Sequence, residues 1–321
     1  MPRQLRSARK ETSASELDRP RPQNGIYEPV RFVASASTPP EQAIVRSHLP
    51  GLDEGDLRIL RKKQNRLRKS AFLTARATLE ISRQASRALA STLIFAQHEA
   101  GTAVCIESRG WILTCAHCFG ETSEEWNSER LKWLLYYNGL AVQVECRAWD
   151  ERRDLALAKI VQIEILDELC RGPVAPIFSY VPIAKSMSFS SPIFCIGQPG
   201  ADDLESVSLR KTAYDLFELS EGRICGMLAG ADPQDNSEIG TLKHTAWTYW
   251  GHSGAPLLRR SDGALLGLHS SWDDTTTMRH GVPLAAIRSF ITENLPIDSV
   301  DSTVSEASED LQDIIVIDGV D

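Results

Sequence analysis

The residues Gly251-His252-Ser253-Gly254-Ala255-Pro256 decide how this chain is interpreted. Glycine accepts backbone conformations that other residues avoid, so the flanking glycines allow a sharp turn that holds the Ser253 hydroxyl outward. The same turn directs successive backbone N–H groups to one point, as an oxyanion hole requires. A serine between glycines is also common in surface loops. The motif therefore indicates a nucleophile only if a base and an acid accompany it.

Two motifs upstream supply a histidine and an aspartate at the ends of predicted strands. His117 closely follows the apolar run Trp111-Ile112-Leu113. Asp154 directly precedes the alternating sequence Leu155-Ala156-Leu157-Ala158, which predicts a strand. Asp150 is a rival for the acid, but no such strand follows it directly, so Asp154 is preferred.

The order His117, Asp154, Ser253, with separations of 37 and 99 residues, resembles that of the trypsin-like serine peptidases with the chymotrypsin fold. That family provides the standard example of a catalytic triad. The resemblance covers about residues 92–295 and implies an all-β fold of two antiparallel β-barrels. It implies a serine endopeptidase in which His117 is the base and Asp154 orients it. The resemblance also implies that Ser253 attacks the peptide and that the N–H groups of Gly251 and Ser253 form the oxyanion hole.

Short strands with tight turns support this double-barrel architecture. Asn138-Gly139 separates the apolar runs 134–137 and 140–144, a strong hairpin pattern. Asp262-Gly263 is a second such turn, ahead of the apolar run 265–268. The predicted barrels span about residues 92–185 and 186–296, within a peptidase domain of residues 92–296.

A helical extension is predicted before the first barrel. Residues 1–51 are rich in Pro, Ser and charge and are expected to be disordered. Recurrent leucines with few Gly or Pro predict a basic amphipathic helix over residues 52–91, capped by Asp53 or Asp56. Residues 58–87 contain ten Lys or Arg and the single acid Glu80.

Two interpretations of this basic helix remain open. The helix packs on the barrel with its arginines solvated, or residues 61–69 form a nuclear-import or nucleic-acid patch. A nucleic-acid-binding protein built around residues 58–69 is a third functional hypothesis. The net charge of −8 disfavours nucleic acid as a partner.

The C-terminal segment has a different composition. Residues 297–321 contain eight acids and no Lys or Arg, and are expected to be a disordered acidic tail. Within it, four β-branched residues flanked by acids resemble a SUMO-interacting motif: Ile314, Ile315, Val316 and Ile317. Such a segment can add a strand to the sheet of a partner such as SUMO. Alternatively, the tail folds back on the basic helix or stays disordered.

Composition also indicates the cellular compartment. No apolar segment is long enough for a transmembrane helix, and the first residues lack the apolar core of a secretory signal. Seven cysteines are an odd number without close-spaced pairing, which predicts reduced thiols in a cytosolic or nuclear protein that is not secreted.

Two further predictions concern the cysteines near His117. Cys118 stands where secreted relatives often carry half of a disulfide, but Ala100 holds the partner position, so this bridge is expected to be missing. Cys115 and Cys118 beside His117 suggest a zinc site, yet no second ligand pair at zinc-finger spacing follows. No metal and no cofactor are therefore predicted.

Residues around Ser253 suggest which peptides are cleaved. Many trypsin relatives carry an aspartate directly before the serine and pair it with a new N-terminus on activation. His252 stands there instead, and a polar, non-acidic residue at this position resembles glutamyl endopeptidases and HtrA-type proteases. Activation by a new N-terminus is therefore not expected. Trp247, six residues before the serine, argues against cleavage after Arg or Lys. Thr248 and His269 match substrate-binding residues of glutamyl endopeptidases and exfoliative toxins, which predicts cleavage after Glu or Asp. Ser270 matches the serine that supports the triad aspartate.

Two alternatives to these functional predictions stay open. His269 packs in the barrel without touching substrate, or the whole chain is a catalytically latent, protease-like binding module recruited through its helix and tail. Covalent labelling of the serine distinguishes the enzyme from the binding module.

Overall fold

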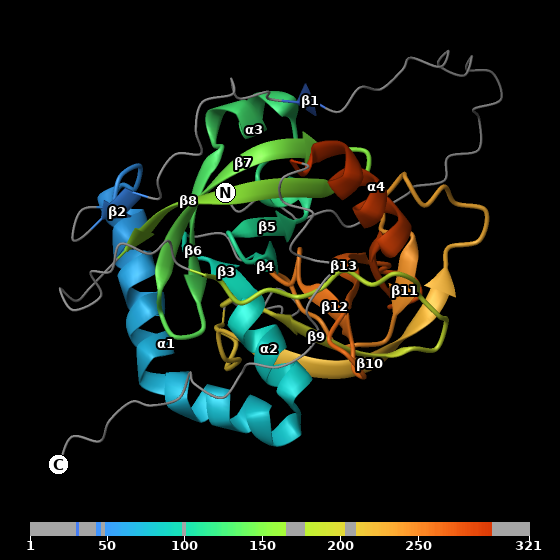
Figure 1. The fold of residues 1–321 in the computed structure, drawn as a ribbon, viewed down its shortest axis with the longest axis horizontal. Coiled ribbons are helices and arrows are strands. Elements are labelled where there is room, and N and C mark those ends of the chain that lie inside the picture. The colour runs from blue at the N-terminus through green and yellow to red at the C-terminus, as the bar shows by residue number, and fades with distance from the viewer. Residues whose placement is uncertain are drawn as a thin grey trace.

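Two closed antiparallel β-barrels, each of six strands, form the body of the protein (Figure 1). They are seen in a computed structural model that describes residues 30–31, 43–45, 49–97, 101–164, 177–202 and 210–296. The predicted all-β class with two barrels is confirmed. The N-terminal and C-terminal disorder predictions, with Ile314, Ile315, Val316 and Ile317, fall mostly or wholly outside the described residues.

The first barrel follows the strand order β7-β6-β3-β4-β5-β8 and closes through pairing of β7 with β8. Its strands are β3 (Thr92–Phe95), β4 (Thr102–Glu107), β5 (Trp111–Thr114), β6 (Leu131–Tyr136), β7 (Ala141–Asp150) and β8 (Leu155–Glu164). Two short strands add to its edges: β1 (Val30–Arg31) lies antiparallel to β7, and β2 (Ala43–Val45) lies parallel to β8. The predicted hairpin turn is present between β6 and β7, where Gly139 has φ of 80°.

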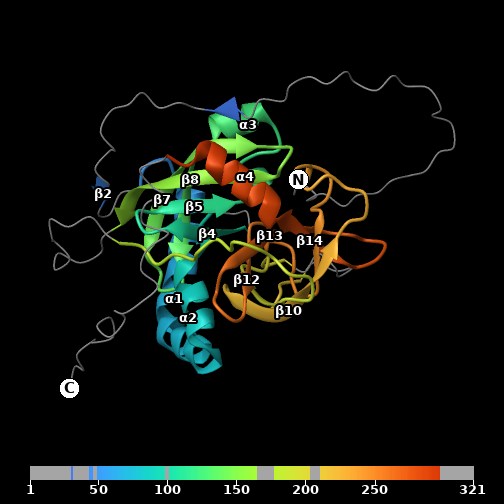
Figure 2. The same ribbon diagram turned by 45° about the vertical axis from the view of Figure 1, so that its right-hand side comes forward.

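The second barrel follows the order β10-β11-β14-β13-β12-β9. Its strands are β9 (Pro192–Gly197), β10 (Glu218–Met227), β11 (Leu242–His244), β12 (Pro256–Arg259), β13 (Leu265–Trp272) and β14 (Arg279–Pro283). Helix α4 (Leu284–Asn294) follows and contacts both β8 of the first barrel and β13 and β14 of the second (Figures 1 and 2). The two barrels therefore form one packed unit.

The predicted helical extension consists of two helices, α1 (Glu54–Ile81) and α2 (Arg83–Ser91). Asp53 caps the first, because its Oδ1 accepts a hydrogen bond from the Asp56 N–H at 2.7 Å. The expectation of one uninterrupted helix is wrong. Ser82 takes an extended conformation and its Oγ accepts the Ala85 N–H at 3.0 Å, which ends α1 and starts α2.

The first half of α1 packs against the first barrel through both apolar and polar side chains. Leu60 and Leu67 belong to the hydrophobic core. Gln64 is fully buried and its Nε2 donates to Gly139 O at 2.8 Å and to the Glu164 carboxylate at 2.6 Å. Lys63 donates to two backbone carbonyls, and burial lowers its pKa to about 8. These contacts favour the packing interpretation of the helix, while nucleic-acid binding stays a prediction.

Two further observations concern the helices and the cysteines. Among the described residues, none of the helices has both the length and the apolar composition that crossing a membrane requires. The cysteines within those residues are free thiols: Cys105, Cys115, Cys118, Cys146, Cys195 and Cys225. Cys118, for which the sequence predicts no disulfide, is among these free thiols.

Candidate active site

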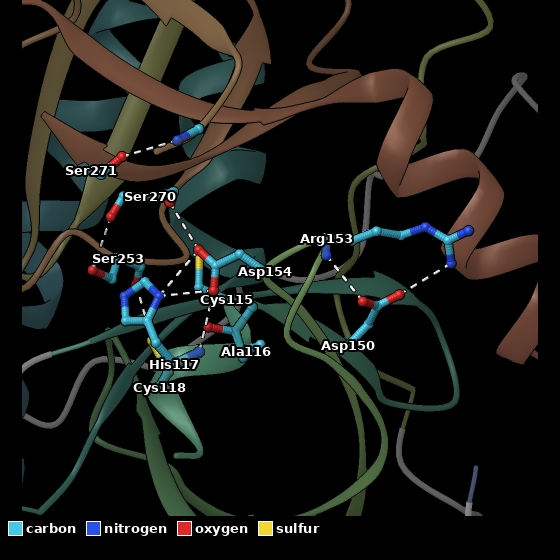
Figure 3. Close-up of polar contacts among 12 residues, drawn as sticks. Cys115, Ala116, His117, Cys118, Asp150, Arg153, Asp154, Ser253, Ser270 and Ser271 are labelled. Atoms are coloured by element: carbon cyan, nitrogen blue, oxygen red, sulfur yellow. Dashed lines mark hydrogen bonds and ion pairs between the residues drawn. The ribbon is translucent and has the colours of Figure 1, made fainter. Parts of the chain in front are cut away.

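The three predicted triad residues line one open cavity, with an empty volume of about 710 Å³, to which both barrels contribute. His117 lies on the 3₁₀ turn η1 (Ala116–Cys118) directly after β5. Asp154 ends the turn between β7 and β8, and Ser253 lies in the loop before β12. Separate strand ends thus bring together residues that are far apart in the sequence (Figure 3).

The histidine and the aspartate are directly bonded. His117 Nδ1 lies 2.8 Å from Asp154 Oδ1 and 3.1 Å from Oδ2, and the His117 backbone N–H donates to Oδ1 at 3.2 Å. Ser270 Oγ donates a hydrogen bond to Oδ2 of this carboxylate at 2.8 Å (Figure 3). A carboxylate only accepts hydrogen bonds, so Nδ1 carries the proton and Nε2 is the basic nitrogen.

Electrostatics keep this carboxylate ionised. Burial alone would raise the pKa of Asp154, but the charge of His117 and the hydrogen bonds from His117 and Ser270 hold it below its usual value. The residue also adopts a φ of 52°, a left-handed conformation that is uncommon outside glycine. Functional sites are where such backbone strain concentrates.

Asp150, the rival acid, takes no part in this arrangement. Its carboxylate accepts from the Arg153 backbone N–H at 3.0 Å and from the Arg153 guanidinium at 3.2 Å. Arg153 in turn pairs with Glu293 of α4 at 2.7 Å. Figure 3 shows Asp150 directed at Arg153, away from His117. The role of Asp150 is to anchor this turn.

The loop around Ser253 depends on glycine. Gly251 and Gly254 have φ values of 98° and 81°. A Cβ atom at Gly254 would collide with the Thr102 carbonyl and the Thr114 hydroxyl, so only glycine fits there. Within the described part of the chain, the N–H groups of Gly251 and Ser253 have no backbone acceptor, which leaves them available for an oxyanion.

His252, beside the serine, is 1% exposed and its Nδ1 lies 3.1 Å from the Tyr249 backbone. Burial lowers the pKa of His252 to about 4, so the ring is neutral at pH 7. A neutral imidazole cannot form a buried ion pair with an N-terminal ammonium. This environment is consistent with the prediction that insertion of a new N-terminus is not the route of activation.

The predicted substrate-binding residues Thr248 and His269 line the same cavity. Sequence reasoning missed the partner of His269: His244, fully buried on β11, whose Nε2 lies 3.1 Å from His269 Nδ1. Burial is the main cause that lowers the pKa of His269, and it lowers that of His244 to about 3. Both rings are therefore neutral at pH 7.

The tautomers of this histidine pair follow from the hydrogen bonds. His244 Nδ1 is buried and has no partner among the described residues. An unpaired buried acceptor is tolerated better than an unpaired buried N–H. His244 therefore donates from Nε2 to His269 Nδ1, which leaves an N–H on His269 Nε2, on the other edge of a ring that lines the cavity.

Other charged and aromatic groups in or near the cavity belong to no motif that the sequence shows. Arg279 on β14 lies close enough to lower the pKa of His269 further, although burial is the larger cause. Glu121 and Glu238 line the cavity as acids. Trp250 and Trp272 also line it, with their rings in edge contact at 6.1 Å between centroids.

Comparisons with known proteins identify the family of the chain. A family model described as "Trypsin-like peptidase domain" matches residues 101–268, just over half of the chain. Among solved structures, the chain is similar to the crystal structure of Deg5, at 16% sequence identity and a TM-score of 0.47. That match covers 64% of this chain and 89% of the other. A search of curated proteins found no match.

Proposed function

Because the chain belongs to the trypsin-like peptidase family and is a serine endopeptidase, we propose that His117, Asp154 and Ser253 carry out its peptide hydrolysis. The main support is the bond of 2.8 Å between His117 Nδ1 and Asp154, in a cavity that Ser253 also lines. A serine hydroxyl is a weak nucleophile until a neighbouring base removes its proton.

The proposed reaction proceeds through an acyl-enzyme. Ser253 Oγ attacks the scissile carbonyl while His117 Nε2 accepts its proton, and the Gly251 and Ser253 N–H groups bind the oxyanion. His117 then donates the proton to the leaving amine. Water then attacks the acyl-enzyme in the same way, with His117 again as the base, and releases the second product. Asp154 holds the imidazole in the required tautomer and stabilises its charged form.

Attack requires Ser253 Oγ to lie within hydrogen-bond reach of His117 Nε2. Ser253 Oγ lies 3.5 Å from Ser270 O, a long contact that holds the hydroxyl weakly. Catalytic hydrogen bonds are often long in the absence of substrate and shorten when it binds.

We further propose cleavage after Glu or Asp. The His269 N–H and the Thr248 hydroxyl are donors for a substrate carboxylate, and Arg279 adds a positive charge nearby. The acids Glu121 and Glu238 line the same cavity and repel further negative charge. The preferred peptide therefore carries an acid at the cleaved residue and neutral or basic residues around it.

Matched peptides that differ only in Glu against Gln at the cleaved residue test this preference. Glutamine has the same shape without the charge, and a hydrogen bond to a charged group is worth about 1.5–3 kcal/mol. We expect kcat/KM to be about 10- to 150-fold higher for the Glu peptide. Equal or better cleavage after Arg, Leu or Phe would contradict the acidic preference.

The proposed setting is the cytosol or nucleus. Free thiols at all described cysteines support a reducing compartment. The proposed partners are peptide substrates. Binding of SUMO through residues 314–317 stays a prediction.

A further inference from the structure

Three side chains with metal-binding atoms converge on the buried edge of the proposed triad. One ligand atom each from Cys115, His117 and Asp154 lies within 4.8 Å of the other two, the one such group among the described residues. We propose that these residues form an inhibitory site for Zn²⁺. The loss of activity rests on the proposed function, whereas the binding of the metal does not.

The donor set suits zinc. Thiolate, imidazole and carboxylate are its usual protein ligands, at about 2.3 Å for sulfur and about 2.0–2.2 Å for nitrogen and oxygen. Two ligands of one tetrahedral zinc ion lie about 3.3 Å apart. His117 Nδ1 and Asp154 Oδ1, hydrogen-bonded at 2.8 Å, must therefore separate by about half an ångström to admit the ion. Cys115 lies close enough for its thiol to interact with the Asp154 carboxylate. Small side-chain movements therefore complete a three-ligand site.

The sequence alone argued against zinc because no second ligand pair follows Cys115 and Cys118. The structure supplies the missing ligand from a distance: Asp154 reaches the site from the turn between β7 and β8. Figure 3 shows Cys115 beside the carboxylate, on the side of His117 that carries Nδ1.

The cavity provides the route of entry. His117 and Asp154 both line it, and 16% of the His117 side chain is exposed. Cys115 is fully buried behind them. An ion entering from the cavity meets the imidazole and the carboxylate first and the thiol last.

Bound zinc would stop catalysis by fixing the wrong tautomer. Zinc bonded to Nδ1 leaves the ring proton on Nε2, the nitrogen that must accept the Ser253 proton. The Cys115 thiol releases its proton to solvent when the sulfur binds the ion. The change is a ligand exchange without oxidation, so a chelator reverses it.

Cys115 is well suited to a diagnostic substitution. Its Sγ donates a long contact of 3.4 Å to the His269 carbonyl and lies beside the Asp154 carboxylate, but it is none of the atoms that the proposed reaction bonds or breaks. Cys118 gives a matched control: it directly follows His117 in the chain, but its Sγ contacts the Ser253 carbonyl at 3.7 Å and lies outside the ligand group.

The first experiment titrates Zn²⁺ into the full-length enzyme during peptide hydrolysis, followed by EDTA. We expect inhibition that EDTA reverses, and at least about a tenfold higher half-inhibitory zinc concentration for Cys115→Ala and Cys115→Ser. Cys118→Ala should keep the sensitivity of the unmodified chain. Equal inhibition of the Cys115 variants, or no inhibition of the unmodified chain, overturns the proposal.

A second experiment removes the dependence on activity. Cd²⁺ replaces Zn²⁺ and reports thiolate ligation by an ultraviolet charge-transfer band, recorded on the inactive Ser253→Ala protein. We expect one equivalent of ion to produce the band, and Cys115→Ala in the same background to abolish it while Cys118→Ala retains it. A band that survives Cys115→Ala, or no band at all, rejects the site whether or not the protein hydrolyses peptides.

Discussion

Replacing Asp154 with asparagine is expected to lower kcat for peptide hydrolysis by about 10⁴-fold. The amide cannot stabilise the charged imidazole, and its NH₂ group favours the tautomer with the proton on His117 Nε2. Ser270 and the backbone N–H of His117 still hold the side chain in place, so the loop should keep its structure. Steady-state kinetics with a peptide cleaved by the unmodified enzyme measures the effect, and KM should change little.

Asp150→Asn is the matched control for this variant. Asp150 has the same side chain on the same turn, but it pairs with Arg153. Its replacement should lower thermal stability and leave kcat unchanged for the folded fraction. Loss of kcat in Asp150→Asn with retention in Asp154→Asn would show that the acid was assigned to the wrong residue.

Replacing His269 with alanine is expected to remove the acidic preference. The kcat/KM for a peptide cleaved after Glu should fall by about 10- to 150-fold, the value of one hydrogen bond to a charged group. The kcat/KM for the matched Gln peptide should fall far less, because the Gln side chain is neutral and brings no charge into the cavity that His269 must stabilise. The ratio of the two kcat/KM values is the measurement, since it is insensitive to the amount of folded enzyme.

The control for His269 is another buried histidine. His280 on β14 is 2% exposed, and its Nδ1 contacts Gly240 O at 2.6 Å, so it takes no part in lining the cavity. His280→Ala should keep the Glu-to-Gln ratio of the unmodified enzyme. If His269→Ala also keeps that ratio, His269 packs in the barrel and does not recognise substrate.

The barrels and the candidate triad were predictable because each feature has a local pattern. His117, Asp154 and Ser253 all lie at the ends of apolar or alternating runs, and the end of a strand is a position that local sequence marks. Asn138-Gly139 specifies its hairpin through the positive φ that the turn requires. Preference for Asp154 over Asp150 followed from the strand after it, and the hydrogen bonds agree.

The surroundings of the triad depend on pairing between distant strands, which local sequence does not encode. His244 and Arg279 are cross-strand neighbours on β11 and β14, and this register alone brings both near His269. Cys115 meets Asp154 for the same reason, since β5 pairs with β8. The break at Ser82 was missed because a serine inside a leucine pattern is compatible with a continuous helix until its hydroxyl caps a new one.

Covalent labelling by a fluorophosphonate probe tests the central claim most directly, because the probe reacts with an activated serine and needs no knowledge of the substrate. The intact chain and Ser253→Ala are incubated with the probe, and the modified residue is located by mass spectrometry. The proposed triad predicts a single adduct on Ser253 and no labelling of Ser253→Ala. An unlabelled intact chain, or equal labelling of both proteins, would contradict an active Ser253 nucleophile.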